Sequence, residues 1–232
     1  MRTRRTPWIQ LNLLILIFIF SGCATNTVSP DRASLPAPVH PPLPPPLKQN
    51  LVAIAGFENR SAFAADKLWD TCSQQLSTHL IEMGFFRVVE WERMKKLFSW
   101  DALSTSSLVK IPEKRDEARK ILLCEYFISG AITYFDVSRH SRVSAISKQK
   151  TFYTTVRVDL SLQDAMTGEY VAAASAETIE TQVFTGGVAG GETGTWSPRS
   201  ADLALNKAIK EALYELTIRF EKLSLKESNN KK

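Results

Sequence analysis

The chain has 232 residues, of which 44% are hydrophobic and 23% are charged. This composition is ordinary for a globular protein and excludes a disordered chain, a collagen-like repeat and a protein with several membrane spans. The formal net charge is +5, but three of the positive charges lie in the first 22 residues, which hold no acidic residue, and without them the charge is +2. So small a charge predicts no binding to nucleic acid.

The amino terminus has the pattern of a bacterial lipoprotein signal. Three arginines precede an apolar run from Leu11 to Phe20, which matches a secretory signal and is short for a membrane-spanning helix. Ser21 and Gly22, two small residues, then precede Cys23. We therefore expect residues 1–22 to be a signal peptide and Cys23 to carry acyl chains such as palmitate; the alternative is an uncleaved membrane anchor.

The residue after this cysteine bears on the membrane to which the protein is sorted. In lipoproteins of this kind, Asp at that place commonly holds the chain at the inner membrane, and here the residue is Ala24. The expected location is the periplasmic face of the outer membrane, because more than one acyl chain on Cys23 is enough for stable anchoring.

A proline-rich tether is expected over residues 23–50. Eight of the eleven prolines lie between Ser29 and Leu47. Such tracts favour polyproline II, so the stretch from Ala24 to Gln49 has a reach of up to about 80 Å. Both an active reach toward a periplasmic target and a passive linker remain open.

One folded domain is expected over residues 51–225, followed by a disordered tail at 226–232. The apolar run 51–57 is typical of a buried strand, and apolar residues every four positions over 68–83 predict a helix that ends at Gly84. Residues 85–89 predict a second strand and 91–98 a short helix. A polar loop is expected at 104–107, and Pro112 suits the first position of the next helix.

The second half of the domain predicts strands and a last helix. Residues 126–135 are typical of a strand, and a polar stretch follows up to Thr151. Alternating apolar and polar residues over 156–163, a turn at 167–169 and a strand from Tyr170 to Val183 predict a long β-hairpin. A glycine-rich loop over 186–194 and a helix capped by Ser200 complete the domain. The order predicts an α/β fold of the α+β sandwich type: a mixed β-sheet covered by helices, with a long hairpin and a C-terminal helix in the C-terminal half.

No residue pattern predicts catalysis, a metal or a cofactor. The three histidines, His40, His79 and His140, have no ligand spacing. Gly186–Gly191 lacks the Lys-Ser/Thr pair of a phosphate-binding loop. Glu90 and Glu92 are expected to be solvated or to cap a helix. Cys72 and Cys124 either pair as a disulfide or, as burial favours, remain free thiols.

Several phrases together resemble the CsgG family of curli secretion components. They are Gly56-Phe-Glu-Asn-Arg-Ser61, Phe86-Arg-Val-Val-Glu-Trp-Glu-Arg93, Tyr126-Phe-Ile-Ser-Gly130 and the segment from Leu160 to Glu169. The resemblance implies a periplasmic α/β domain on an outer-membrane lipoprotein, which in curli systems forms a homo-oligomeric ring and a pore for export.

The stretches that would form the pore depart from the family pattern. A membrane-spanning strand needs about 9 to 11 residues with an apolar lane and aromatic girdles. The stretch 136–151 has basic residues at alternate positions, and 181–197 contains five glycines. The sequence therefore favours a ring without predicting a pore.

The hypothesis from the sequence is a non-enzymatic, lipid-anchored periplasmic lipoprotein of the CsgG type, acting in assembly or secretion. Its expected partners are the outer membrane, further copies of itself and other envelope proteins, with no nucleic acid and no small-molecule substrate. One alternative is a tethered activator of a peptidoglycan synthase, a penicillin-binding protein, because the tether of residues 30–47 suits that architecture. A second alternative is a subunit of an envelope ring such as the flagellar ring.

Overall fold

The computed structural model describes residues 40, 41, 43, 46, 48–63, 68–143, 147–187 and 194–230. The elements in chain order are β1 (Leu51–Asn59), α2 (Leu68–Met83), β2 (Arg87–Val88), α3 (Trp91–Leu97), α4 (Trp100–Ser104), α5 (Ser107–Lys110), α6 (Pro112–Leu122), β3 (Tyr126–Val143), β4 (Ser147–Asp164), β5 (Tyr170–Gly187) and α7 (Pro198–Asn230). The strands form one five-stranded sheet in the order β2-β1-β3-β4-β5. Because β1 pairs in parallel with β2 and β3, whereas β3, β4 and β5 pair antiparallel, the predicted mixed sheet with helices is confirmed.

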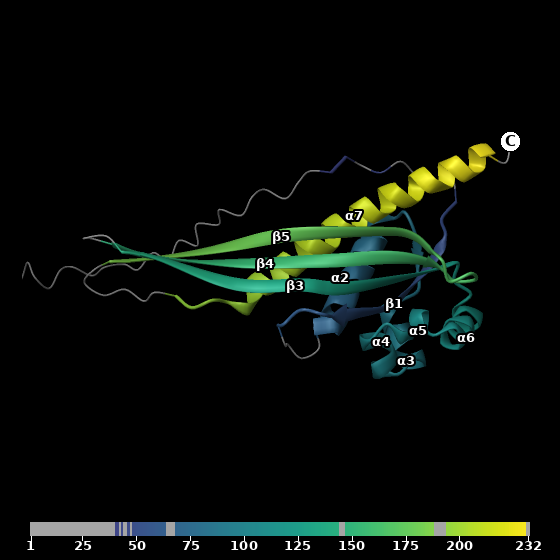
Figure 1. Cartoon of the computed structure of the whole chain (residues 1–232), viewed down its shortest axis with the longest axis horizontal. Helices are drawn as coiled ribbons and strands as arrows, with labels where there is room; N and C mark the ends of the chain where they lie inside the picture. The colour runs from purple at the N-terminus through teal and green to yellow at the C-terminus, as the bar shows by residue number, and fades with distance from the viewer. Residues whose placement is uncertain are drawn as a thin grey trace, which may run out of the picture.

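The helices divide between the two faces of the sheet. α2 and α7 pack together on one face, where α7 lies against β4 and β5 (Figure 1). α4 and α5 lie on the other face against β1. The backbone of α4 can approach β1 closely because residue 56 is a glycine. A Cβ at Gly56 would lie 1.9 Å from the backbone oxygen of Leu103 in α4.

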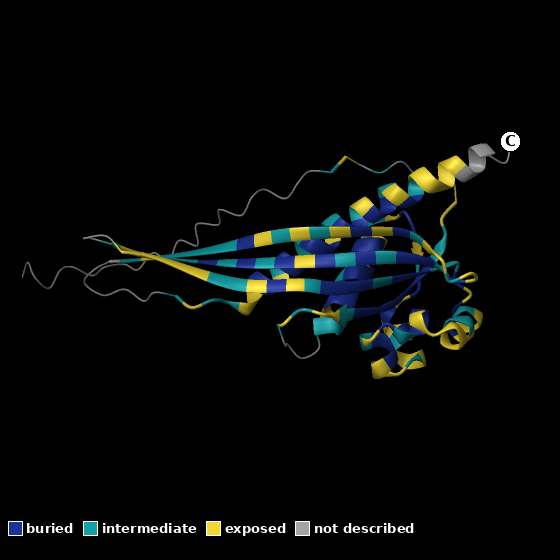
Figure 2. Cartoon of the chain, in the orientation of Figure 1, coloured by how far each residue is buried: buried dark blue, intermediate teal, exposed yellow. Residues whose placement is uncertain are grey.

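The hydrophobic core fills the space between the sheet and the pair α2 and α7, and it continues to buried residues of α3, α4, α5 and α6. The even-numbered residues of β4 from Phe152 to Leu162 are buried, and α7 contributes a buried stripe. That alternation places one face of β4 in the core and leaves the odd-numbered residues on the other face. Figure 2 shows the buried colour concentrated where the helices cover the sheet.

Three strands are longer than the sequence analysis predicted. β3, β4 and β5 have 18 residues each, which corresponds to about 60 Å of strand. Their far ends project beyond the helices, at the left of Figure 1. The polar stretch expected after residue 135 continues as β3 up to Val143, because pairing with β4 satisfies the backbone where no apolar face has to be buried.

The prediction of a polar loop at 104–107 is also wrong in part. α4 runs to Ser104 and α5 begins at Ser107. Ser99 caps α4 by accepting a hydrogen bond from the backbone N–H of Ala102, at 3.3 Å, and the buried residues Leu103 and Leu108 hold the two short helices in place. Burial of these side chains in the folded domain therefore stabilises two helices that are too short to be stable alone.

α7 differs from expectation at its start and extends past residue 225. It begins at Pro198, and the Oγ of Ser197 accepts from the N–H of Arg199 at 3.3 Å, so Ser200 is not the cap. Ser200 is instead a fully buried residue in the first turn of α7. The helix continues beyond residue 225, where the sequence analysis ends the domain, to Asn230. No helix among the described residues is long and apolar enough to cross a membrane.

Candidate functional site

The face of β3, β4 and β5 opposite α7 is left largely uncovered, and it contains a hollow of about 550 Å³. We call it the sheet hollow. It lies between α5 and the uncovered strands, because the helices on this side stop over β1. Its polar lining residues are Glu58, Arg60, Ser106, Lys110, Ser129, Asp159, Ser161, Tyr170, Ser175 and Arg219.

Small hydroxyl side chains form the floor of the sheet hollow. Ser129 of β3 and Ser161 of β4 are paired residues in the ladder, and their Oγ atoms lie 2.9 Å apart. One row further along, Ser175 of β5 donates a hydrogen bond to Asp159. Because serine side chains at these positions are short, the floor lies below the level of α5 and Tyr170.

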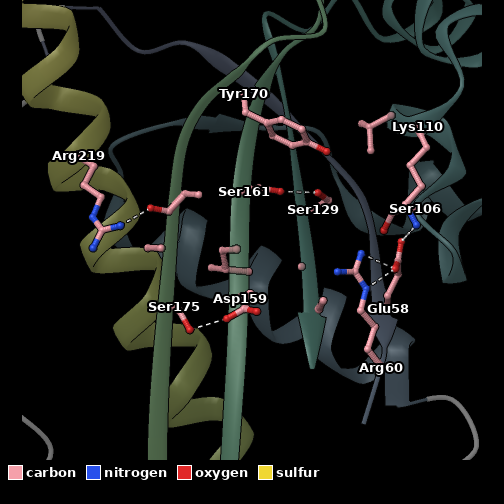
Figure 3. A pocket seen from close by; sticks show the side chains of 16 residues that line it. Glu58, Arg60, Ser106, Lys110, Ser129, Asp159, Ser161, Tyr170, Ser175 and Arg219 are labelled. Atoms are coloured by element: carbon pink, nitrogen blue, oxygen red, sulfur yellow. Dashed lines mark hydrogen bonds and ion pairs between the residues drawn. The ribbon is translucent and has the colours of Figure 1, made fainter. Parts of the chain in front are cut away.

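One wall is an ion-pair cluster centred on a single carboxylate. The side chain of Glu58 is only 12% exposed, and Arg60 Nε donates to its Oε2 at 2.8 Å. Lys110, in the last turn of α5, donates to the other oxygen and also to the carbonyl of Thr105 at 3.0 Å. Figure 3 shows the Glu58 carboxylate between these two cations. The wall therefore carries one positive charge in excess.

Ser106 adds an unusual backbone conformation to this wall. Its φ of 51° is left-handed, a region that costs a residue with a Cβ about 1–2 kcal/mol. The residue is 2% exposed, and its Oγ has no hydrogen-bond partner among the described residues. A buried hydroxyl without a partner gives the hollow a polar atom that a contacting molecule could satisfy.

The polar side chains of the sheet hollow define what it can do chemically. Catalysis by a serine needs a base within hydrogen-bond reach, held in turn by a third group. Within the part of the chain that the structure describes, the hydroxyls of Ser129 and Ser161 contact each other, and no group of three or more His, Cys, Asp or Glu side chains is arranged to hold a metal. The hydroxyl, carboxylate and cationic side chains that line the hollow can donate and accept hydrogen bonds and pair with charges.

The candidate residues of the sequence analysis fall elsewhere. Cys23 lies outside the described residues. Glu90 precedes α3 and makes no side-chain capping bond, and Glu92 pairs with Lys95 at 2.6 Å. Gly186 and Gly187 end β5, and the rest of Gly186–Gly191 lies outside the described residues.

Cys72 and Cys124 are both buried free thiols, as expected from their apolar surroundings. Burial raises the pKa of the Cys72 thiol, and it raises that of Cys124 from 9.0 to about 12.

The sheet hollow is not evident as a site from the sequence, although part of its lining lies in the phrases that carry the family resemblance. Glu58 and Arg60, Ser129 and Gly130, and the strand around Leu160 all belong to phrases that carry the family resemblance. The structure brings these phrases, which are far apart in the sequence, to the wall and the floor of one hollow.

A family of known proteins matches most of the chain. The sequence profile described as "Curli production assembly/transport component CsgG" matches residues 43–232. The chain belongs to the CsgG family. Membership supports an envelope protein with the CsgG fold, and no curated protein matches the chain directly.

Three solved structures are similar to the CsgG-family chain at low identity. Lipoprotein GNA1162 from Neisseria meningitidis has a TM-score of 0.42 at 13% identity, covering 67% of this chain and 92% of its own. A putative neuraminyllactose-binding hemagglutinin homologue from Helicobacter pylori has a TM-score of 0.44 at 11% identity, covering 84% and 97%. The C-terminal domain of LpoB from Escherichia coli has a TM-score of 0.39 at 12% identity, covering 56% and 82%.

Proposed function

We propose that this CsgG-family protein is a non-enzymatic lipoprotein of the outer membrane that assembles into a homo-oligomeric ring and serves the assembly or export of extracellular material. The observation that carries the proposal is the family match, which spans residues 43–232 and so includes the whole described sheet. The lipoprotein pattern at Cys23 supports an envelope location on independent grounds.

The uncovered face of β3–β5 is the surface on which we place the contact between neighbouring subunits. Two exposed apolar side chains lie there: Tyr134 is 47% exposed and Ile179 is 51% exposed. Between them Arg157 Nη2 donates to Glu177 Oε2 at 2.7 Å across two strands. A face with apolar side chains around a central ion pair has the mixed character of protein interfaces.

The first test is the mass of the acylated protein extracted in detergent, by light scattering, with electron microscopy of the particles. The proposal requires a closed particle of several subunits. A monomer would overturn the ring and would favour the alternative, a tethered activator of a peptidoglycan synthase; binding of periplasmic synthases would then be measured by pull-down.

A matched pair of variants tests the surface itself. Ile179→Glu places a charge on the uncovered face and should convert the particle to smaller species, because an unpaired charge in an interface is costly. Ile121 on α6 is 42% exposed, and Ile121→Glu should leave the mass unchanged. If both variants, folded by circular dichroism, keep the full mass, the subunit contact lies elsewhere.

The anchor is tested separately. Cys23→Ser removes the thiol that accepts the first lipid, so the variant should remain an unprocessed precursor without fatty-acid label. Normal labelling of that variant with radioactive palmitate would refute the assignment of Cys23, whatever the oligomeric state.

A further inference from the structure

Part of the proline-rich segment, beginning at His40, lies against the helices of the domain. His40 stacks on Tyr214 of α7, with ring centroids 3.9 Å apart and an angle of 23° between the planes. The Nε2 of His40 also lies 2.6 Å from Oε2 of Glu211, one turn earlier on the same helix. Both side chains of this pair are about four-fifths buried, at 23% and 21% exposed.

The next residues of the segment contact the same helix pair. The hydroxyl of Tyr214 donates to the carbonyl of Pro41 at 3.1 Å. Leu43 is partly buried and packs against the hydrophobic core. One aromatic side chain thus holds the segment through its ring face at His40 and through its hydroxyl at Pro41.

A groove of about 350 Å³ lies between the segment and the helices α2 and α7, and His40, Pro41 and Leu43 of the segment form one side of it. The helices line it with His79, Glu82, Met83, Lys210 and Tyr214. An aromatic ring, an apolar thioether and polar side chains at the rim suit a proline-rich strand, which is extended, offers carbonyl acceptors and has few N–H donors.

The groove also contains a buried polar atom without a partner in the described part of the chain, Nε2 of His79. His79 is 9% exposed; its Nδ1 lies 3.1 Å from Oε2 of Glu82, and its Nε2 has no partner among the described residues. The groove therefore has an unused hydrogen-bonding atom next to the segment.

We propose that this groove, the tether seat, binds the proline-rich tether of the same chain and thereby sets how far the domain stands from its membrane anchor. With the tether seated at His40, the residues between the anchor and the seat are Ala24–Val39, whose fully extended length is at most about 50 Å. With the tether released, the free stretch extends to Gln49 and the limit rises to about 80 Å. Release from the seat would therefore lengthen the reach by about 30 Å.

Seating in the same chain is favoured because the segment enters the domain directly at β1. Only the residues between His40 and Leu51 separate the seated segment from the first strand, so the local concentration of the segment at its own seat is high. The change of reach rests on the anchor at Cys23; the seat itself rests neither on the anchor nor on the ring.

The test is photo-crosslinking in cells that make the full chain. A benzophenone amino acid is placed at Lys210, an exposed residue at the rim of the seat. Irradiation should join α7 to the tryptic peptide that ends at Lys48, and the product should migrate as a monomer on a denaturing gel. A product of twice the mass would show that the seat takes the tether of a neighbouring chain and would overturn the proposal.

Two variants and one matched control test whether these contacts hold the segment in the seat. The quantity compared is the yield of the monomeric crosslink. His40→Ala and Tyr214→Ala should each lower the seated-to-free ratio about tenfold, because a hydrogen bond and an aromatic stack are lost. His140→Ala changes the same residue type as His40→Ala at an exposed position of β3 and should leave the yield of the monomeric crosslink unchanged.

His40 lies outside the folded domain, so its replacement tests the seat even if Tyr214→Ala impairs folding. Capture that is insensitive to His40→Ala would overturn the proposal. The failure of the ring in light scattering would leave this result unaffected.

Discussion

The ring of Phe57 lies directly over Gly130, its partner on the neighbouring strand β3. A Cβ at Gly130 would lie 2.2 Å from Cε2 of Phe57. Phe57 is fully buried, so its ring has no solvent-exposed space into which it could move. The absence of a side chain at Gly130 is what lets β1 and β3 lie side by side with a phenyl ring between the sheet and the helices.

Gly130→Ala should destabilise the domain by about 2 kcal/mol, because the added methyl forces a buried ring out of its position. Urea unfolding followed by circular dichroism measures the loss. The double variant Phe57→Leu/Gly130→Ala should lose less than the sum of the two single variants, since the smaller side chain leaves room for the methyl. Additive losses would show that the overlap is relieved in some other way.

Leu123→Gly should stabilise the protein by about 1 kcal/mol. Leu123 ends α6 in a left-handed conformation with φ 54°, and its side chain is 78% exposed. Glycine relieves the strain and sacrifices little buried surface, although part of the gain is offset by the greater freedom of the unfolded chain. Leu123→Ala, which keeps the Cβ, is the control and should not stabilise; thermal unfolding of both distinguishes the cases.

Lys207→Met should cost about 3 kcal/mol, because it leaves a buried carboxylate without its cation. The side chain of Glu180 in β5 is only 5% exposed, and its Oε2 lies 2.7 Å from Nζ of Lys207 in α7. Replacing both, as Lys207→Met/Glu180→Leu, should recover most of the loss in chemical denaturation.

The exposed pair Arg157 and Glu177 is the comparison for this prediction. Its side chains are 52% and 41% exposed, so Arg157→Met should change the stability of the dissociated subunit by less than about 1 kcal/mol. Equal losses at the two sites would contradict the role given to burial.

Cys72 and Cys124 should resist alkylation by iodoacetamide at pH 8 in the folded protein and react fully in denaturant. The reagent attacks the thiolate, and burial keeps both thiols protonated by raising the pKa of each, that of Cys124 to about 12.

The same shifts predict how stability depends on pH. A thiol whose folded-state pKa is raised above its unfolded value of 9.0 contributes stability that is fully present below pH 9 and is lost as the pH rises toward 12. Denaturation midpoints measured between pH 8 and pH 11 should therefore fall, and Cys124→Ala should reduce the fall. Rapid alkylation of native protein at pH 8 would contradict both expectations.

The sequence by itself determined the order of the strands and the longer helices, and which face of β4 enters the core. The apolar repeat of α2, Pro112 at the start of α6 and the alternation of β4 all depend on local periodicity, which one strand or helix carries alone. Both free cysteines followed from the same apolar patterns. The family phrases also lie in such local runs, so the resemblance was readable without coordinates.

Tertiary structure decided what depends on residues far apart in the chain. Strand pairing extended β3 through a polar stretch that has no apolar alternation to indicate it, and burial against β1 created α4 and α5 within an expected loop. The sheet hollow requires Glu58, Lys110 and Ser161 to meet, and the tether seat requires His40 to reach Tyr214. No local pattern encodes such meetings, because they depend on how the sheet and helices pack rather than on the period of any one of them.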